Sequence, residues 1–188
     1  DVRVIQSWPY GGAYVLDALW SELEIPKVVE EHARLHKTKQ PFERALFAMV
    51  ANKALQPYSK LYCHEQWLPE GVFFPGRDAI QLQHLYRAMD FLEANKEKIE
   101  KAIYFRVADL FNVDVDLIFY DTTSLHFEID EEDELASHGN ELAGGKRYEP
   151  LRKRGHSKNG RTDAPQIVVG LAVTRDGLPV RSWVFPGN

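Results

Sequence analysis

Apolar positions recur at helical spacing through residue 112 of the chain and at strand spacing after it. The spacing predicts helices over residues 13–24, 26–36, 42–55, 77–95 and 96–111. Residues 58–76 are rich in aromatic side chains and interrupted by proline and glycine, which predicts an irregular connection. The first part of the chain is therefore expected to be a helical region.

The longer expected helices have apolar stripes that predict their buried faces. The stripes are Phe42, Leu46, Met49 and Val50 in the first, Leu85, Met89 and Leu92 in the second, and Ile99, Ile103, Val107, Leu110 and Phe111 in the third. A stripe of this kind is typical of a core face, and we expect these side chains to form the core.

After Asn112 the pattern becomes extended. A strand is expected over 115–121, with a continuation through Phe127 left open. Two apolar runs, 166–173 and 178–185, flank Asp176-Gly177, which is a strong hairpin signal. The predicted fold is α+β, with a helical region over 1–112 and a strand-containing region over 113–188.

Asp121 directly follows a run of apolar and aromatic residues. Such a run predicts a strand buried on both faces, and a carboxylate at its tip would be held rigidly, as metal-assisted phosphoryl chemistry requires. The alternative is an aspartate that begins a turn. Thr122, Thr123 and Ser124 would then offer hydroxyls beside a metal site or cap backbone groups.

Composition limits the class of protein but does not define it. The chain has 188 residues, 44% hydrophobic and 27% charged, with a formal net charge of −5, as is usual for a globular protein. Its one cysteine, Cys63, excludes an internal disulfide and fits a reducing cytoplasm, and no apolar run is long enough to predict a membrane span. Both ends look cut, which suggests part of a longer protein.

Charge is distributed unevenly along the second region. An acidic segment, residues 128–134, precedes a basic segment, residues 146–161. The candidate DNA contacts in the basic segment are Lys146, Arg147, Arg152, Lys153, Arg154, His156, Lys158 and Arg161. The alternative reading of both segments is a solvated loop. Asp176 is best explained by its turn, and Asp163 by a turn or a cap at the entry to the next strand. Cys63-His64 lacks the further ligands that a zinc site needs.

Several segments, in this order, resemble bacterial insertion-sequence transposases of the DDE type, which carry an Asp-Asp-Glu metal triad on a ribonuclease-H-like fold. They are Tyr120-Asp121-Thr122-Thr123-Ser124, Arg154-Gly155-His156-Ser157-Lys158, the run from Asp163 to Val180, and Phe185-Pro186-Gly187-Asn188. The resemblance covers residues 113–188 well and the helical region only loosely.

The resemblance implies that residues 113–188 are the incomplete start of a ribonuclease-H-like mixed α/β catalytic domain. Asp121 matches the first aspartate of the triad, and the second aspartate and the glutamate would lie beyond Asn188. The implied activity is DNA transposition: metal-dependent cleavage and joining of strands at the inverted-repeat ends of the element. It further implies Mg²⁺ or Mn²⁺ in the complete catalytic domain, a homodimer, and action in the bacterial cytoplasm at the nucleoid.

The chemistry also limits what this chain can do alone. DNA cleavage of this kind uses two divalent ions roughly 4 Å apart, so a single aspartate would bind Mg²⁺ weakly. The 188-residue chain by itself is therefore expected not to cleave DNA. Two other readings stay open: a non-catalytic DNA-binding or dimerisation module, including a decayed transposase remnant, and a ribonuclease-H-like nuclease unrelated to transposition.

Overall fold

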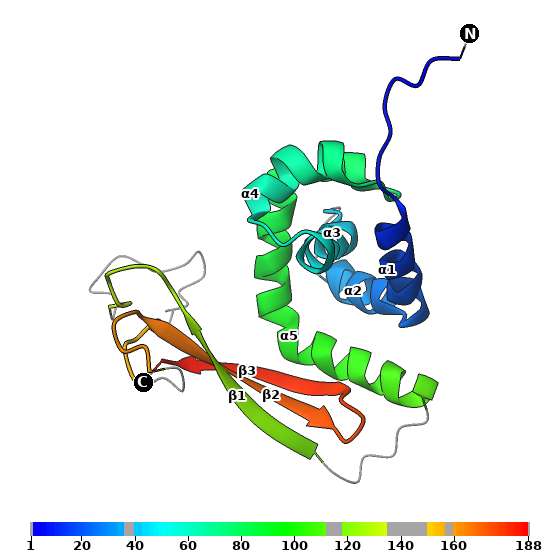
Figure 1. The fold of residues 1–188 in the computed structure, drawn as a ribbon. Coiled ribbons are helices and arrows are strands. Elements are labelled where there is room, and N and C mark those ends of the chain that lie inside the picture. Colours follow the sequence, from blue (N-terminus) through cyan, green and yellow to red (C-terminus); the bar gives the residue numbers. More distant parts are fainter. Residues whose placement is uncertain (1, 36–39, 112–117, 135–149, 157–159, 188) are drawn as a thin grey trace. The chain divides into compact units, whose positions relative to one another are not determined.

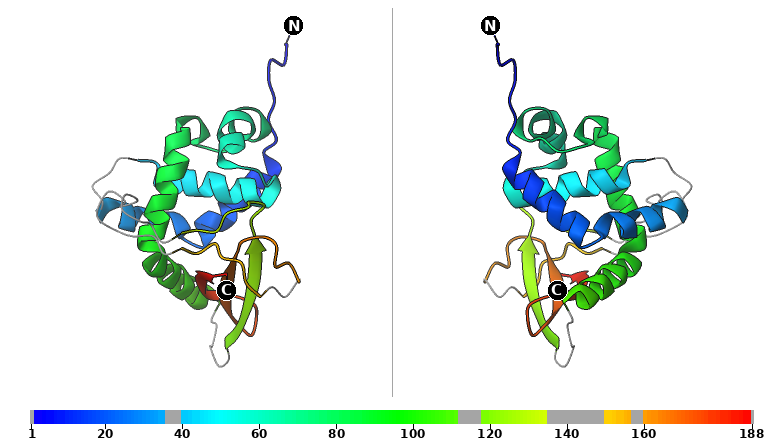
Figure 2. Two further views of the ribbon diagram at one scale, coloured as in Figure 1. Left: turned by 90° about the vertical axis from the view of Figure 1, so that its left-hand side faces the viewer. Right: turned by 90° about the vertical axis from the view of Figure 1, so that its right-hand side faces the viewer.

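The computed structural model describes residues 2–35, 40–111, 118–134, 150–156 and 160–187. The chain divides into two compact units, Asp1–Val113 and Asp114–Asn188. Helices form the first unit and an antiparallel sheet forms the second, so the fold is α+β, as the sequence predicts (Figures 1 and 2).

The helical unit is built from four α-helices of different lengths, one short helical turn and two tighter or wider helical segments. They are α1 (Gly11–Glu22), α2 (Ile25–Leu35), α3 (Phe42–Leu55), α4 (Lys60–Tyr62), the π-helix η1 (Cys63–Gly71), the 3₁₀ turn η2 (Arg77–Ala79) and α5 (Leu82–Phe111). Among the described helices, none is long and apolar enough to cross a membrane.

Helix α3 lies at the centre of this unit, against α1, α2 and α5 (Figure 1). Ala45, Ala48 and Ala51 are buried on it, and their small side chains let neighbouring helices approach closely. Phe42 stacks on Phe91 of α5 with 4.6 Å between ring centroids. The core of the unit is therefore organised around the alanine-rich face of α3.

Three details of the predicted helices are wrong. Residues 77–95 and 96–111 do not form two helices, because α5 runs unbroken from Leu82 to Phe111. At the expected break, Asn95 is buried within the helix, and its side-chain amide donates to the carbonyl of Phe91, 2.9 Å away. The connection expected to be irregular contains α4 and η1.

The third detail is which stripe is buried. Val50, Met89, Leu92 and Leu110 are exposed, while Leu85, Ala88, Phe91 and Ile99 form the buried face of α5. Both stripes of α5 have helical spacing, so periodicity alone could not choose between them. Packing of Phe91 against Phe42 selects the face.

The second unit contains β1 (Ile118–His126), β2 (Gln166–Thr174) and β3 (Pro179–Pro186), paired antiparallel in the order β1-β2-β3. The predicted hairpin is confirmed: β2 and β3 are joined across a turn in which Gly177 has a φ of 82°, a conformation that favours glycine. The Thr174 amide donates to the carbonyl of Leu178 across this turn, at 2.9 Å. The expected placement of the hairpin in the same sheet as Asp121 is also confirmed.

Candidate functional site

Asp121 lies inside a strand and not at its tip. It pairs with Leu171 of β2, and β1 continues to His126. The hydroxyl-bearing residues after Asp121 suit an extended, half-exposed strand, which explains the continuation. Its carboxylate accepts the neighbouring Thr122 amide at 2.7 Å and is exposed.

Strand β1 is also neither central nor buried among the described strands. Strand β2 lies between β1 and β3, and Ile118, Phe119 and Tyr120 are each about half exposed. The expectation of a strand covered on both faces is therefore wrong for the residues that the structure describes. The apolar run reflects strand propensity and not burial.

The strand register places different side chains on the two faces of the sheet. Asp121 shares its face with Leu171 and Ser182, since residues directly opposite each other point the same way. Four large apolar side chains on this face are exposed: Phe119, Leu125, Leu171 and Val184. Asp121 thus lies in the middle of an open, largely apolar face.

The opposite face carries an aromatic pair above a glycine. Tyr120 and Trp183 meet edge to face with ring centroids 5.6 Å apart. They approach over Gly170, and the guanidinium of Arg181 lies 5.3 Å from the Trp183 ring centroid. This cluster holds β1, β2 and β3 together. It also explains why position 170 of β2 is a glycine, since the aromatic rings fill the space of a side chain there.

The described residues do not complete a metal site around Asp121. Nowhere in them do three or more His, Cys, Asp or Glu side chains gather to hold an ion. Mg²⁺ needs several oxygen ligands, so the donor set present here does not fit a resident metal. Cys63 is buried, and burial raises the pKa of its thiol to about 11, which makes it a poor nucleophile.

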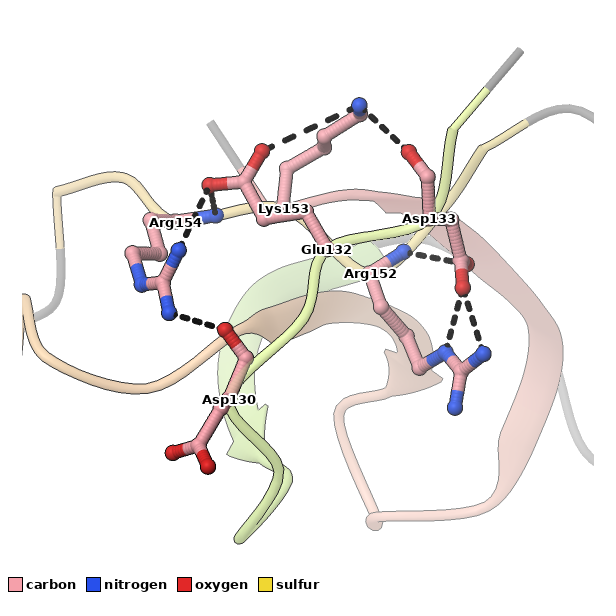
Figure 3. Close-up of polar contacts among 6 residues, drawn as sticks. All are labelled: Asp130, Glu132, Asp133, Arg152, Lys153 and Arg154. Atoms are coloured by element: carbon pink, nitrogen blue, oxygen red, sulfur yellow. Dashed lines mark hydrogen bonds and ion pairs between the residues drawn. The ribbon is translucent and has the colours of Figure 1, made fainter.

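Acidic and basic segments, by contrast, are brought together directly (Figure 3). Asp133 accepts hydrogen bonds from Nε of Arg152 at 2.7 Å and from the Arg152 amide at 2.9 Å, and its own amide donates to the Arg152 carbonyl at 2.9 Å. The Arg152 guanidinium also lies 5.7 Å from the ring centroid of Phe127. The hydrogen bonds that Asp133 accepts from Arg152 hold the pKa of the Asp133 carboxyl below its ordinary value.

Glu132 forms ion pairs with the next two cations of the basic segment, Lys153 and Arg154. One carboxylate oxygen accepts the Arg154 amide at 2.9 Å and lies 3.8 Å from Nη1 of Arg154. The other lies 3.8 Å from Nζ of Lys153, which donates to the carbonyl of Asp133 at 2.6 Å. Arg154 also donates to the carbonyl of Asp130, whose carboxylate points away from the cations (Figure 3).

Arg161 forms a second group of ion pairs further along the chain. Its guanidinium contacts Glu128 at 2.6 Å and Asp163 at 2.9 Å. These contacts lower the pKa of both carboxyls and raise that of Arg161. The expectation that Asp163 begins a turn or caps the strand entry did not include its ion pair with Arg161.

Backbone hydrogen bonds join residues 151–153 of the basic segment to the end of the sheet. Lys153 and Gln166 exchange amide-to-carbonyl bonds of 3.1 and 2.9 Å, and the Gly187 amide donates to Leu151 at 3.1 Å. The fully buried side chain of Gln166 donates to the carbonyl of His156 at 3.0 Å. Arg152, Lys153 and Arg154 are thus presented on a short ordered stretch.

The remaining candidates have mixed outcomes. Lys146, Arg147 and Lys158 lie outside the described residues. His156 contributes its backbone carbonyl, which accepts a hydrogen bond from the side chain of Gln166. Reasoning from the sequence missed Glu132 and Asp133 as partners of the cations, although the opposite charges of the two segments were a usable signal.

Comparison with known proteins adds no relative: no protein family, no curated protein and no solved structure matches this chain.

Proposed function

We propose that this chain carries the first part of the catalytic domain of a DDE-type insertion-sequence transposase, an enzyme that cleaves and joins DNA strands. The observation that carries the proposal is the antiparallel order β1-β2-β3 with Asp121 on β1. The resemblance of the motifs implies this arrangement: first aspartate on the first strand, followed by a hairpin that extends the same sheet.

Asp121 is suited to such a role by its accessibility and not by rigidity at a strand tip. Its side chain lies on the exposed part of β1. In a complete catalytic domain Asp121 would help to hold a divalent ion, which would supply charge stabilisation at the reacting phosphodiester. Because the described residues bring no second and third metal ligand to Asp121, we derive no catalytic step from this chain alone.

The test uses the protein encoded by the complete open reading frame. Asp121→Asn should reduce Mg²⁺-dependent cleavage of a duplex that carries the element's end by more than about 100-fold, while DNA binding is retained. Asp176→Asn is the matched control, because Asp176 lies in the turn before Gly177, where Asn-Gly is equally suitable. Parent-like cleavage by the Asp121→Asn protein would contradict the proposal.

A non-catalytic DNA-binding module is the second candidate. It is favoured by an ordered basic stretch, Arg152 to Arg154, in a set of described residues without a metal cluster. Sequence-independent DNA binding with no cleavage by the complete protein would support it. A ribonuclease-H-like nuclease unrelated to transposition would instead be recognised by the lack of terminal inverted repeats in the flanking DNA.

A further inference from the structure

We propose that the acidic segment, residues 128–134, is an intramolecular competitor of DNA, which occupies Arg152, Lys153 and Arg154 of the basic segment until a polyanion displaces it. This inference rests on the DNA-binding role proposed above for the basic segment. Six of the seven residues in the acidic segment are Asp or Glu, and none is Lys or Arg.

The carboxylates take the positions that phosphate oxygens would take. Asp133 binds one guanidinium side and one backbone amide of Arg152, and Glu132 binds the amide of Arg154. Arginine side chains together with backbone amides are the groups that contact the DNA backbone. The acidic segment therefore satisfies a set of donors of the kind that a phosphate strand would use.

These ion pairs are also exposed enough to exchange. While they are paired, the side chains of Arg152, Lys153 and Arg154 are 44, 31 and 41% exposed, and those of Asp133 and Glu132 are 23 and 33% exposed. Exposed pairs are weak and screened by salt, whereas DNA presents a dense row of charges. DNA phosphates can therefore replace the carboxylates without unfolding of the segment.

The backbone that carries the cations is also held by contacts that do not depend on the carboxylates. Lys153 is held by its backbone pairing with Gln166, and Leu151 by the amide of Gly187. Neither contact involves an acidic side chain. Neutralising Glu132 and Asp133 is thus expected to free the cations for phosphate while the local backbone structure is retained.

The alternative is that the ion pairs have a purely structural role and only stabilise the connection between β1 and β2. Both readings predict some loss of stability when the pairs are removed. They differ in DNA affinity, which rises only if the carboxylates compete with phosphate. The experiment therefore measures binding and stability together.

The experiment compares two double variants of the 188-residue chain. Glu132→Gln with Asp133→Asn removes the paired carboxylates, and Asp130→Asn with Glu131→Gln removes two neighbouring negative charges. Among the described residues, the carboxylates of Asp130 and Glu131 form no ion pair with the basic segment. Both variants change the net charge equally. Fluorescence anisotropy with a labelled random-sequence duplex of about 30 base pairs reports binding across a salt series.

We expect the Glu132/Asp133 variant to bind at least about tenfold more tightly than the Asp130/Glu131 variant at low salt. The slope of log affinity against log salt should steepen by about two units, because about two more phosphate contacts form. Equal gains in both variants would show a net-charge effect and overturn the inference. No gain in either would overturn it as well.

Arg152→Ala with Arg154→Ala separates this failure from failure of the proposed function. If that variant weakens DNA binding while neutralised Glu132 and Asp133 bring no gain, the basic segment binds DNA and the competition is absent. If no variant binds DNA at the lowest salt, both the DNA-binding role of the basic segment and the competition by the acidic segment are wrong.

Thermal melting by circular dichroism checks folding. If the double variant does not melt cooperatively, Glu132→Gln is compared with Glu131→Gln in the same assay, where a gain confined to Glu132→Gln supports competition and equal affinity overturns it.

Discussion

Gly170 shows how one residue allows the sheet to assemble. A Cβ atom built on it would overlap the Tyr120 hydroxyl and lie 3.0 Å from the ring of the same tyrosine. Tyr120 in turn packs edge to face on Trp183. Aromatic side chains from the strands on either side thus cover a bare stretch of β2, and they substitute for the side chain that glycine lacks.

Gly170→Ala is expected to lower the free energy of unfolding by about 1–3 kcal/mol, because the rigid Tyr120 ring must move and lose its contact with Trp183. Urea denaturation of the variant and parent measures the change. The same substitution in a Tyr120→Ala background is the control, since the overlap is then gone. An equal cost in both backgrounds would show that Tyr120 is not the cause.

At the scale of elements, helix faces are chosen by partners and not by periodicity. Helix α5 has overlapping apolar stripes, and the face with Leu85, Ala88 and Phe91 is buried while Met89 and Leu92 are exposed. The partner that decides is α3, whose Phe42 stacks on Phe91. A contact between residues far apart in sequence also lies at the turn between α1 and α2. There Glu24 adopts a φ of 54°, and its carboxylate contacts Arg106 of α5.

Phe91→Ala should destabilise the helical unit by about 3–5 kcal/mol, because it removes a buried aromatic side chain and leaves a cavity beside Phe42. Leu92→Ala, one position further on, should cost about 1 kcal/mol or less, since Leu92 is 38% exposed. Chemical denaturation followed by far-ultraviolet circular dichroism measures both. A reversed order of the two effects would mean that the buried face of α5 is assigned wrongly.

At the scale of the whole molecule, charge complementarity organises the end of the sheet unit. The acidic segment and the residues around Arg152 are separated in sequence but joined by ion pairs and backbone hydrogen bonds. Lowered pKa values of Glu128, Asp133 and Asp163 all arise first from arginine hydrogen bonds. A carboxyl with a lowered folded-state pKa stabilises the fold above its ordinary pKa, and this contribution is lost as the pH falls.

The Arg152 amide proton is a direct probe of this behaviour, because it donates to Oδ2 of Asp133 at 2.9 Å. In a nuclear magnetic resonance titration its chemical shift should change with a midpoint below 3.8, the ordinary value for Asp133. The midpoint should rise in about 1 M salt and in Arg152→Ala, since screening or loss of the guanidinium weakens the carboxylate form. A midpoint at or above the ordinary value would contradict the observed pairing.

The sequence by itself determined that helices precede strands, the hairpin at Asp176-Gly177 and the α+β class. These features depend on local physics: apolar periodicity, the end of α3 before Pro57, and a left-handed glycine in a turn. The extent of β1 up to His126 was also among the open readings. Local signals are written in neighbouring residues, so they can be read without a fold.

Tertiary structure alone decided which face of α5 is buried, that β1 is exposed around Asp121, and that Glu132 and Asp133 bind the basic segment. Each of these depends on residues far apart in the chain. An apolar run has the same sequence whether or not another element covers it, and a carboxylate has the same sequence whether it faces water or an arginine. Only the register of β1 and β2 and the packing of α3 on α5 bring the deciding partners together.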